Sequence, residues 1–138
     1  MITNDIIQID LIALLKLSGT VVDLLGTDEE VREAYYQSKE IAYPNIRVSI
    51  MTEEPRLESE QCDLSRCTFI VRCYAEDSSS GSCQELAAAV VNYLHKKFIS
   101  GTGWSGTIRL VTLSGPATIR EHLWRVEPMF SVNVYPSA

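Results

Sequence analysis

The sequence predicts an α+β fold, with a mainly antiparallel sheet of about four strands, an N-terminal helix and one long helix packed on the sheet. Two observations carry this prediction. Apolar and polar residues alternate over 66–74, which is typical of a half-buried strand, and a helical repeat of apolar residues follows over 82–98. A third observation is that other strand-like stretches complete the sheet. The expected strands are 46–51, 66–74, 107–113 and 124–135.

The segment 66–98 reads RCTFIVRCYAEDSSSGSCQELAAAVVNYLHKKF and is the most informative part of the chain. In its first part, alternate residues fall on one face of an extended strand. These are Cys67, Phe69, Val71 and Cys73. In its second part, apolar residues recur at steps of three and four, which predicts an amphipathic helix. These are Cys83, Leu86, Ala87, Val90, Val91, Leu94 and Phe98.

The expected ends of this helix follow from local signals. Ser82 and Glu85 have the spacing of a capping box, and Gly101 is placed where a left-handed residue ends a helix. A helix with one apolar stripe is stable only where that stripe is covered, and the neighbouring strand face is the nearest cover. We therefore expect the helix to lie across the sheet.

The N-terminal part predicts a helix from about Asn4 or Asp5 to Leu17 and a short helical turn over 21–25. The segment 27–42 leaves two alternatives open, because it has a helical start signal at 27–30 and a strand-like pattern after it. We favour an irregular or strand-like arm. The strand 46–51 follows, with Ile46, Val48 and Ile50 on one face.

The segment 52–65, here called the acidic loop, is polar, carries five acidic residues and contains Pro55. It is longer than most connections between the strands of a hairpin, which favours a role in contacts. Later in the chain, Ser114, Gly115 and Pro116 predict a turn after the strand 107–113. Pro128 in the last strand predicts a bulge or an edge position.

Length and composition predict a single domain over residues 1–138, with 46% hydrophobic and 22% charged residues. The apolar runs are much shorter than the roughly 20 residues that cross a bilayer, and the N-terminus has no signal-peptide pattern. We therefore expect synthesis in the cytoplasm and no membrane partner. The net charge is −6 and the basic residues are scattered along the sequence, which argues against a nucleic-acid-binding surface.

The cysteines have no CxxC spacing, and the two histidines are isolated, so neither a metal site nor a cofactor is expected. The residues concerned are Cys62, Cys67, Cys73, Cys83, His95 and His122. Core thiols are the favoured interpretation of the last three cysteines, and Cys62 stays ambiguous. The chain also has no nucleophile motif, and the run 101–106, GTGWSG, lacks the lysine of a phosphate loop. We expect no catalytic residues and no enzymatic activity.

The order of these elements resembles the tail terminator, or tail completion, proteins of tailed bacteriophages. The resemblance rests on an opening like IDLIALLK, a turn like VVDLLG and the strand-to-helix block RCTFIVRCYAEDSSSGSCQELAAAVVNYL. It continues through GTIRLVTLSGPATIRE and a closing strand like EPMFSVNVY, and so covers nearly the whole chain. The segment 27–42 and the acidic loop depart from the family pattern.

This resemblance implies a virion protein of the tail or neck that forms a homo-oligomeric, hexameric ring on the end of the tail tube. Its implied partners are the tail tube protein and the head connector or stopper protein, with DNA only as cargo passing through the lumen. The residues expected at the interfaces are Glu53, Glu54, Arg56, Glu58, Glu60, Glu76 and Asp77. A head-completion (stopper) protein and a small cytosolic binding domain are the alternatives.

Overall fold

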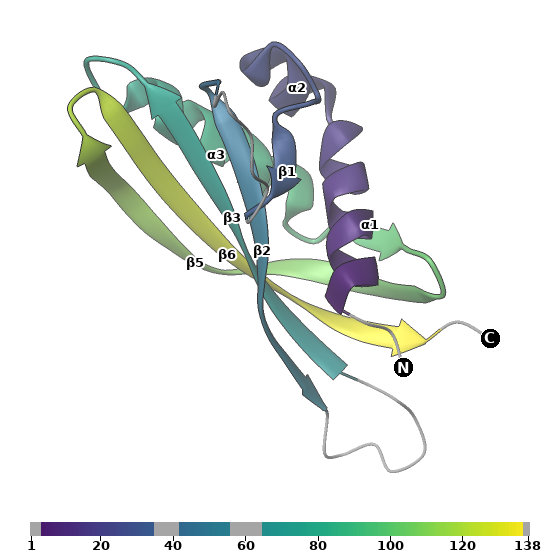
Figure 1. The fold of residues 1–138 in the computed structure, drawn as a ribbon. Coiled ribbons are helices and arrows are strands. Elements are labelled where there is room, and N and C mark those ends of the chain that lie inside the picture. Colours follow the sequence, from purple (N-terminus) through teal and green to yellow (C-terminus); the bar gives the residue numbers. More distant parts are fainter. Residues whose placement is uncertain (1–3, 35–41, 56–64, 137–138) are drawn as a thin grey trace.

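The computed structural model describes residues 4–34, 42–55 and 65–136 as three helices and six strands (Figure 1). The helices are α1 (Asn4–Lys16), α2 (Gly19–Leu25) and α3 (Gly81–Leu94). The strands are β1 (Val31–Glu33), β2 (Asn45–Pro55), β3 (Ser65–Glu76), β4 (Phe98–Ser100), β5 (Trp104–Arg120) and β6 (Leu123–Pro136).

The strands form one sheet in the order β1-β2-β3-β6-β5-β4, and the sheet is strongly curled in Figure 1. The pair β1–β2 is parallel and the other pairs are antiparallel, so the sheet is mixed. The predicted fold class was therefore wrong. The described residues are mostly sheet, with six strands and three short helices, instead of about four antiparallel strands carrying one long helix. The four predicted strands did not include β1 and β4, because a strand of three residues is too short to show a period, and for β1 only an irregular or strand-like arm was expected.

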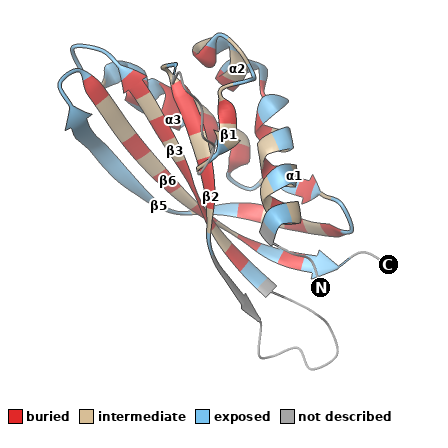
Figure 2. Ribbon diagram, in the orientation of Figure 1, coloured by how far each residue is buried: buried red, intermediate tan, exposed pale blue. Residues whose placement is uncertain are grey.

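The helices cover one face of the sheet, and the core lies between them and the sheet. Figure 2 shows buried residues alternating with less buried ones along β3 and β6, as the two-residue period of a strand requires. Phe69 of β3 and Phe130 of β6 stack at the centre of this layer, with ring centroids 5.4 Å apart. On α3 the buried residues are Cys83, Leu86, Ala87, Val90 and Leu94. Five of the seven residues of the predicted stripe are thus buried, whereas Val91 is half-buried and Phe98, which lies outside α3, is 62% exposed.

The helix α3 is shorter than predicted and does not have the predicted ends. It begins at Gly81, and the Ser82 hydroxyl donates to the Asp77 carboxylate at 2.6 Å instead of capping the helix. It ends at Leu94, because Lys96 has a left-handed φ of 65° and turns the chain back onto the sheet. The Lys96 N–H then donates to the Ile108 carbonyl of β5 at 2.7 Å. Phe98, predicted to be helical, begins β4.

The predicted turn at 114–116 does not occur, since β5 continues to Arg120 with irregular register between Ser114 and Ala117. Glycine and proline are tolerated there because this part of β5 is at the sheet edge, where no N–H is needed for a further ladder. Pro128 lies in β6, which is a central strand, so the expectation of an edge position was wrong. Its missing donor coincides with a gap in the β3–β6 pairing between Ile70–Met129 and Cys73–Val126.

The two segments that depart from the family pattern are only partly described. Within 27–42, β1 is a strand, in agreement with the favoured alternative, and residues 35–41 lie outside the described residues. The acidic loop is shorter than predicted, because β2 extends to Pro55 and β3 begins at Ser65. Residues 56–64 lie outside the described residues.

One carboxylate fastens α1 to the turn between β4 and β5. Asp10 accepts hydrogen bonds from the Thr102 N–H at 2.7 Å, the Thr102 hydroxyl at 3.0 Å and the Trp104 indole N–H at 2.7 Å. Trp104 is fully buried, so its indole N–H needs this acceptor. Gly101 leaves the space, because a Cβ there would lie 2.2 Å from the Trp104 indole nitrogen.

We expect Asp10→Ala to lower the free energy of unfolding by about 2 kcal/mol, because it removes a charged acceptor from three donors, one of them buried. Asp10→Asn is the matched control, since its amide oxygen can still accept, and it should lose clearly less. Urea denaturation followed by tryptophan fluorescence measures both changes. An alanine variant as stable as the wild type would contradict the anchoring role.

Candidate interaction surfaces

The structure separates the residues that the sequence singled out as interface candidates. Glu53 and Glu54 lie near the end of β2, paired with Cys67 and Arg66 at the beginning of β3. Glu76 ends β3, and Asp77 follows it. Because Cys67 and Arg66 are nine and ten residues before Glu76 on β3, the two groups are about 30 Å apart along the strand. Arg56, Glu58 and Glu60 lie outside the described residues.

Glu76 and Asp77 have roles within the fold. The Glu76 carboxylate pairs with the Arg120 guanidinium of β5 at 3.4 Å. Asp77 accepts hydrogen bonds from the Ser78 N–H at 2.7 Å and the Ser82 hydroxyl at 2.6 Å. Its backbone carbonyl accepts from the Trp124 indole N–H at 3.2 Å. These contacts join the turn before α3 to the β5–β6 hairpin.

The hydrogen bonds from Ser82 and Ser78 hold the pKa of Asp77 below its ordinary value of 3.8. Each bond favours the charged carboxylate over the neutral acid. The exposed Asp77 carboxylate therefore stabilises the turn before α3. The sequence signal for this role was the short run of serines around α3.

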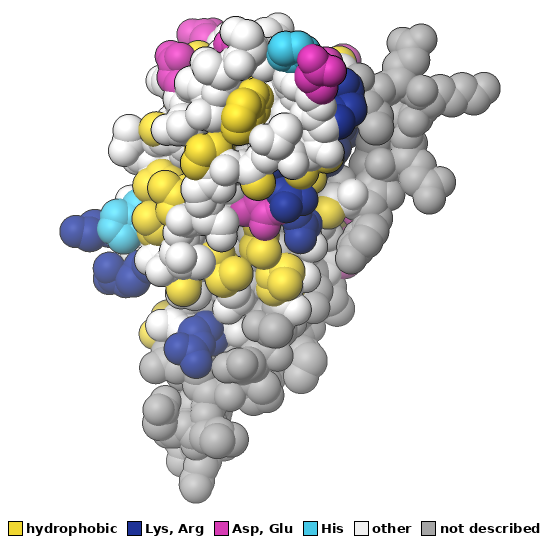
Figure 3. Space-filling view, turned by 90° about the vertical axis from the view of Figure 1, so that its left-hand side faces the viewer, with side chains coloured by type: hydrophobic (Ala, Val, Ile, Leu, Met, Phe, Trp, Pro, Cys, Tyr) yellow, Lys and Arg dark blue, Asp and Glu magenta, His cyan; other side chains and the backbone are white. Residues whose placement is uncertain are grey.

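A first candidate surface is the outer part of β5, here called the β5 edge, over residues 111–119. All its residues are exposed, and the exposed fraction is 56% for Val111, 50% for Leu113 and 44% for Ile119. β4 pairs only with residues 105–107 of β5, so no described strand continues the sheet beside the β5 edge. Figure 3 looks from the side on which β5 lies in Figure 1, and hydrophobic side chains are spread over that side. Such an edge can take another strand.

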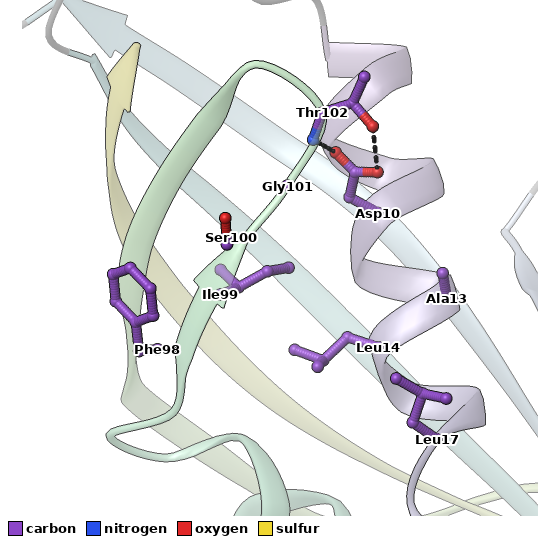
Figure 4. A pocket seen from close by; sticks show the side chains of 9 residues that line it. All are labelled: Asp10, Ala13, Leu14, Leu17, Phe98, Ile99, Ser100, Gly101 and Thr102. Atoms are coloured by element: carbon purple, nitrogen blue, oxygen red, sulfur yellow. Dashed lines mark hydrogen bonds between the residues drawn. The ribbon is translucent and has the colours of Figure 1, made fainter. Parts of the chain in front are cut away.

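A second candidate surface is a groove between α1 and β4 with a volume of about 330 Å³ (Figure 4). Leu14 and Ile99 face each other across it, and Asp10 and Thr102 close one end with their hydrogen bonds. Leu17 and Phe98 stand at its rim and are 77% and 62% exposed. The lining is mostly apolar, which suits contact with another apolar surface more than chemistry.

The described cysteines are packing residues. Cys67, Cys73 and Cys83 are fully buried, which confirms the predicted core thiols, while Cys62 lies outside the described residues. Burial raises the pKa of both Cys73 and Cys83, so neither is a reactive thiolate. Within the described ranges no group of three or more metal-binding side chains comes together, and no helix is long and apolar enough to cross a membrane.

Sequence reasoning did not find the β5 edge or the groove. The β5 edge was hidden by the turn signal of Ser114, Gly115 and Pro116, although Val111, Leu113 and Ile119 form an uncharged stretch with those residues. The groove depends on α1 lying beside β4, which are far apart in the sequence.

No protein-family model and no curated protein matches the chain. Among solved structures, the chain is similar to one in the virion of a native gene transfer agent particle, with a TM-score of 0.79. The alignment covers 95% of this chain and 96% of the other. At 12% identity the likeness shows a shared fold, and it extends over the whole of both chains.

We expect the hydrogen bonds to the Asp77 carboxylate to make the stability of the fold depend on pH in the acidic range. Because the pKa of Asp77 is lowered by folding, its carboxylate stabilises the native state above its ordinary pKa. This contribution is lost as the pH falls below about 4 through the lowered pKa. Asp77→Asn should remove that part of the pH dependence of the melting temperature, measured between about pH 6 and pH 2.5.

Glu33→Gln, at the exposed end of β1, is the matched control and should keep the wild-type profile. If the melting temperature of Asp77→Asn falls with acid pH as steeply as that of the wild type, the stabilising role of the Asp77 carboxylate is contradicted.

Proposed function

We propose that this protein is a structural component of a phage-like virion, and that it forms a ring that caps the tail tube and joins it to the head connector. The observation that carries this proposal is the fold likeness to a chain of a gene transfer agent virion over nearly the full length of both. It agrees with the independent resemblance of the sequence to phage tail terminator proteins.

The exposed surfaces support an assembly role. The β5 edge offers unpaired backbone and apolar side chains, and the α1–β4 groove has exposed Leu17 and Phe98 at its rim. These are two different patches on one chain. Contact between different patches of successive copies is heterologous and closes into a ring when the rotation allows. We propose that such contacts build a hexamer.

We further propose that the acidic loop contributes contacts to a neighbouring copy or to the tail tube protein. The motive is energetic, since ordering a polar segment costs about 1–2 kcal/mol per residue and buries little apolar surface. A contact made on assembly offsets that cost. DNA passes through the ring as cargo in this scheme. We propose a purely structural role, without enzymatic activity.

We expect the purified protein to form a closed ring of six copies. Sedimentation velocity gives the mass in solution, and negative-stain electron microscopy gives the shape. A protein that stays monomeric at tens of micromolar, both alone and with tail tubes present, would contradict the ring proposal.

Replacing residues 56–64 by a two-residue turn should leave the fold intact and weaken assembly. The β2–β3 pairing reaches Pro55 and Ser65, so a tight turn can join the strands directly. Circular dichroism should be unchanged, while ring formation or the joining of tails to heads should fail. Full assembly of this variant would show that the loop is not an interface.

A further inference from the structure

The arginines of the described chain gather on one face of the sheet, although they are scattered in the sequence. This face, here called the arginine face, is the one opposite the helices. It carries six of the seven described arginines, and Arg120 at the β5–β6 turn is the seventh. The six are Arg32, Arg47, Arg66, Arg72, Arg109 and Arg125.

The strand registers place these residues on the arginine face. Arg32 pairs with Arg47, and Arg47 pairs with Arg72, so three neighbouring strands each carry an arginine in one row. Arg125 pairs with Tyr74, and Arg109 pairs with Ser131. In each strand the residues next to these arginines, such as Val31, Ile46 and Val126, are buried under the helices. Alternation along a strand therefore sends the arginines to the other side.

Acidic side chains hold part of this face in a fixed arrangement. Glu127 pairs with Arg125 at 2.5 Å and with Arg72 at 3.7 Å, and Glu30 pairs with Arg47 at 3.5 Å. The side chains of Arg72 and Arg125 remain 26% and 35% exposed. The Arg47 side chain is only 13% exposed. The pairs with Glu127 thus order the guanidinium groups of Arg72 and Arg125 and leave them partly exposed, which reduces the entropy that a partner must remove.

The choice of cation favours a protein partner. Protein interfaces are enriched in arginine and methionine and depleted in lysine. All described basic residues on the arginine face are arginines, and Met129 lies on it, paired with the nearly buried Ile70. The three described lysines lie elsewhere, with Lys16 at the end of α1 and Lys96 and Lys97 after α3.

The chain also carries the complementary charge. Residues 17–31 contain four acidic residues and no basic residue. Asp23, Asp28 and Glu29 are exposed and form what we call the acidic corner, between α2 and β1. The corner is at the β1 edge, and Arg109 is on β5, four strands away and so about 19 Å across the sheet. The corner of a given copy is thus remote from its own Arg109.

We propose that the arginine face binds the acidic corner of a second copy of this chain. This rests on the proposed function, because it names the contact through which successive subunits of the ring recognise one another. The two patches differ, so the contact is heterologous and can repeat around a ring. Complementary charges fix the register of such a contact and speed its formation. The net charge of −6 makes the chain as a whole a poor partner for nucleic acid, while the acidic corner is supplied by every copy.

The test is a charge reversal with a built-in rescue. Arg109→Glu changes an exposed residue of the arginine face, and Asp28→Lys with Glu29→Lys changes the acidic corner. Each should weaken self-association at least about tenfold in sedimentation experiments at 0.15 M salt. Combining all three changes in one chain restores opposite charges and should recover part of the loss. Lys16→Glu, an exposed reversal on α1, is the matched control and should assemble like the wild type.

The outcomes separate this inference from the proposed function. A wild-type protein that forms rings, with Arg109→Glu assembling equally well, overturns the inference and leaves the ring proposal standing. A wild-type protein that never self-associates contradicts both. A short DNA duplex is the second probe, in fluorescence anisotropy at the same salt. Tight DNA binding that Arg109→Glu abolishes, with self-association unaffected, would assign the arginine face to nucleic acid and overturn the proposal.

Discussion

The central constraint in this protein is the pairing of β3 with β6, which places Phe69 against Phe130 under the helices. Every other strand is ordered outward from this pair, with β2 on one side and β5 on the other. Because side chains alternate along both strands, the register that buries the two rings also decides what stands on the opposite face. A slip of one residue would bring Arg72 and Arg125 into the core, so core packing and surface charge are fixed together.

The helices complete the core and leave other parts of the sheet uncovered. α3 lies over β3, β6 and part of β5, and α1 lies over β1 and β2. Residues 111–119 of β5 are all exposed. The Asp10 carboxylate fastens α1 to the β4–β5 turn, and the Asp77 carboxylate holds the turn before α3.

Much of the core could be predicted from the sequence, but the sheet around it could not. The alternation of Cys67, Phe69, Val71 and Cys73 was a strong periodic signal, and all four residues are buried. The helical stripe was also a strong signal, and its residues up to Leu94 are buried except Val91, while Phe98 is exposed. The number and direction of the strands could not be predicted, because β1 and β4 are formed by backbone pairing to distant segments. The glycine and proline in β5 were predicted to form a turn, because no local sequence signal shows that a strand lies at the edge of a sheet.

The sequence by itself determined which residues prefer the core, where α1 and the centres of the long strands lie, and the net charge of −6. It also fixed the resemblance to tail terminator proteins, which rests on the order of those elements. Only the tertiary structure determined on which surface the charged side chains lie. Successive arginines of this face are 6 to 37 positions apart along the chain. They share a face because strand order and register, set by long-range pairing, bring positions that point to the same side of the sheet next to one another. Net charge is a sum over residues, whereas a charged surface depends on which strands become neighbours.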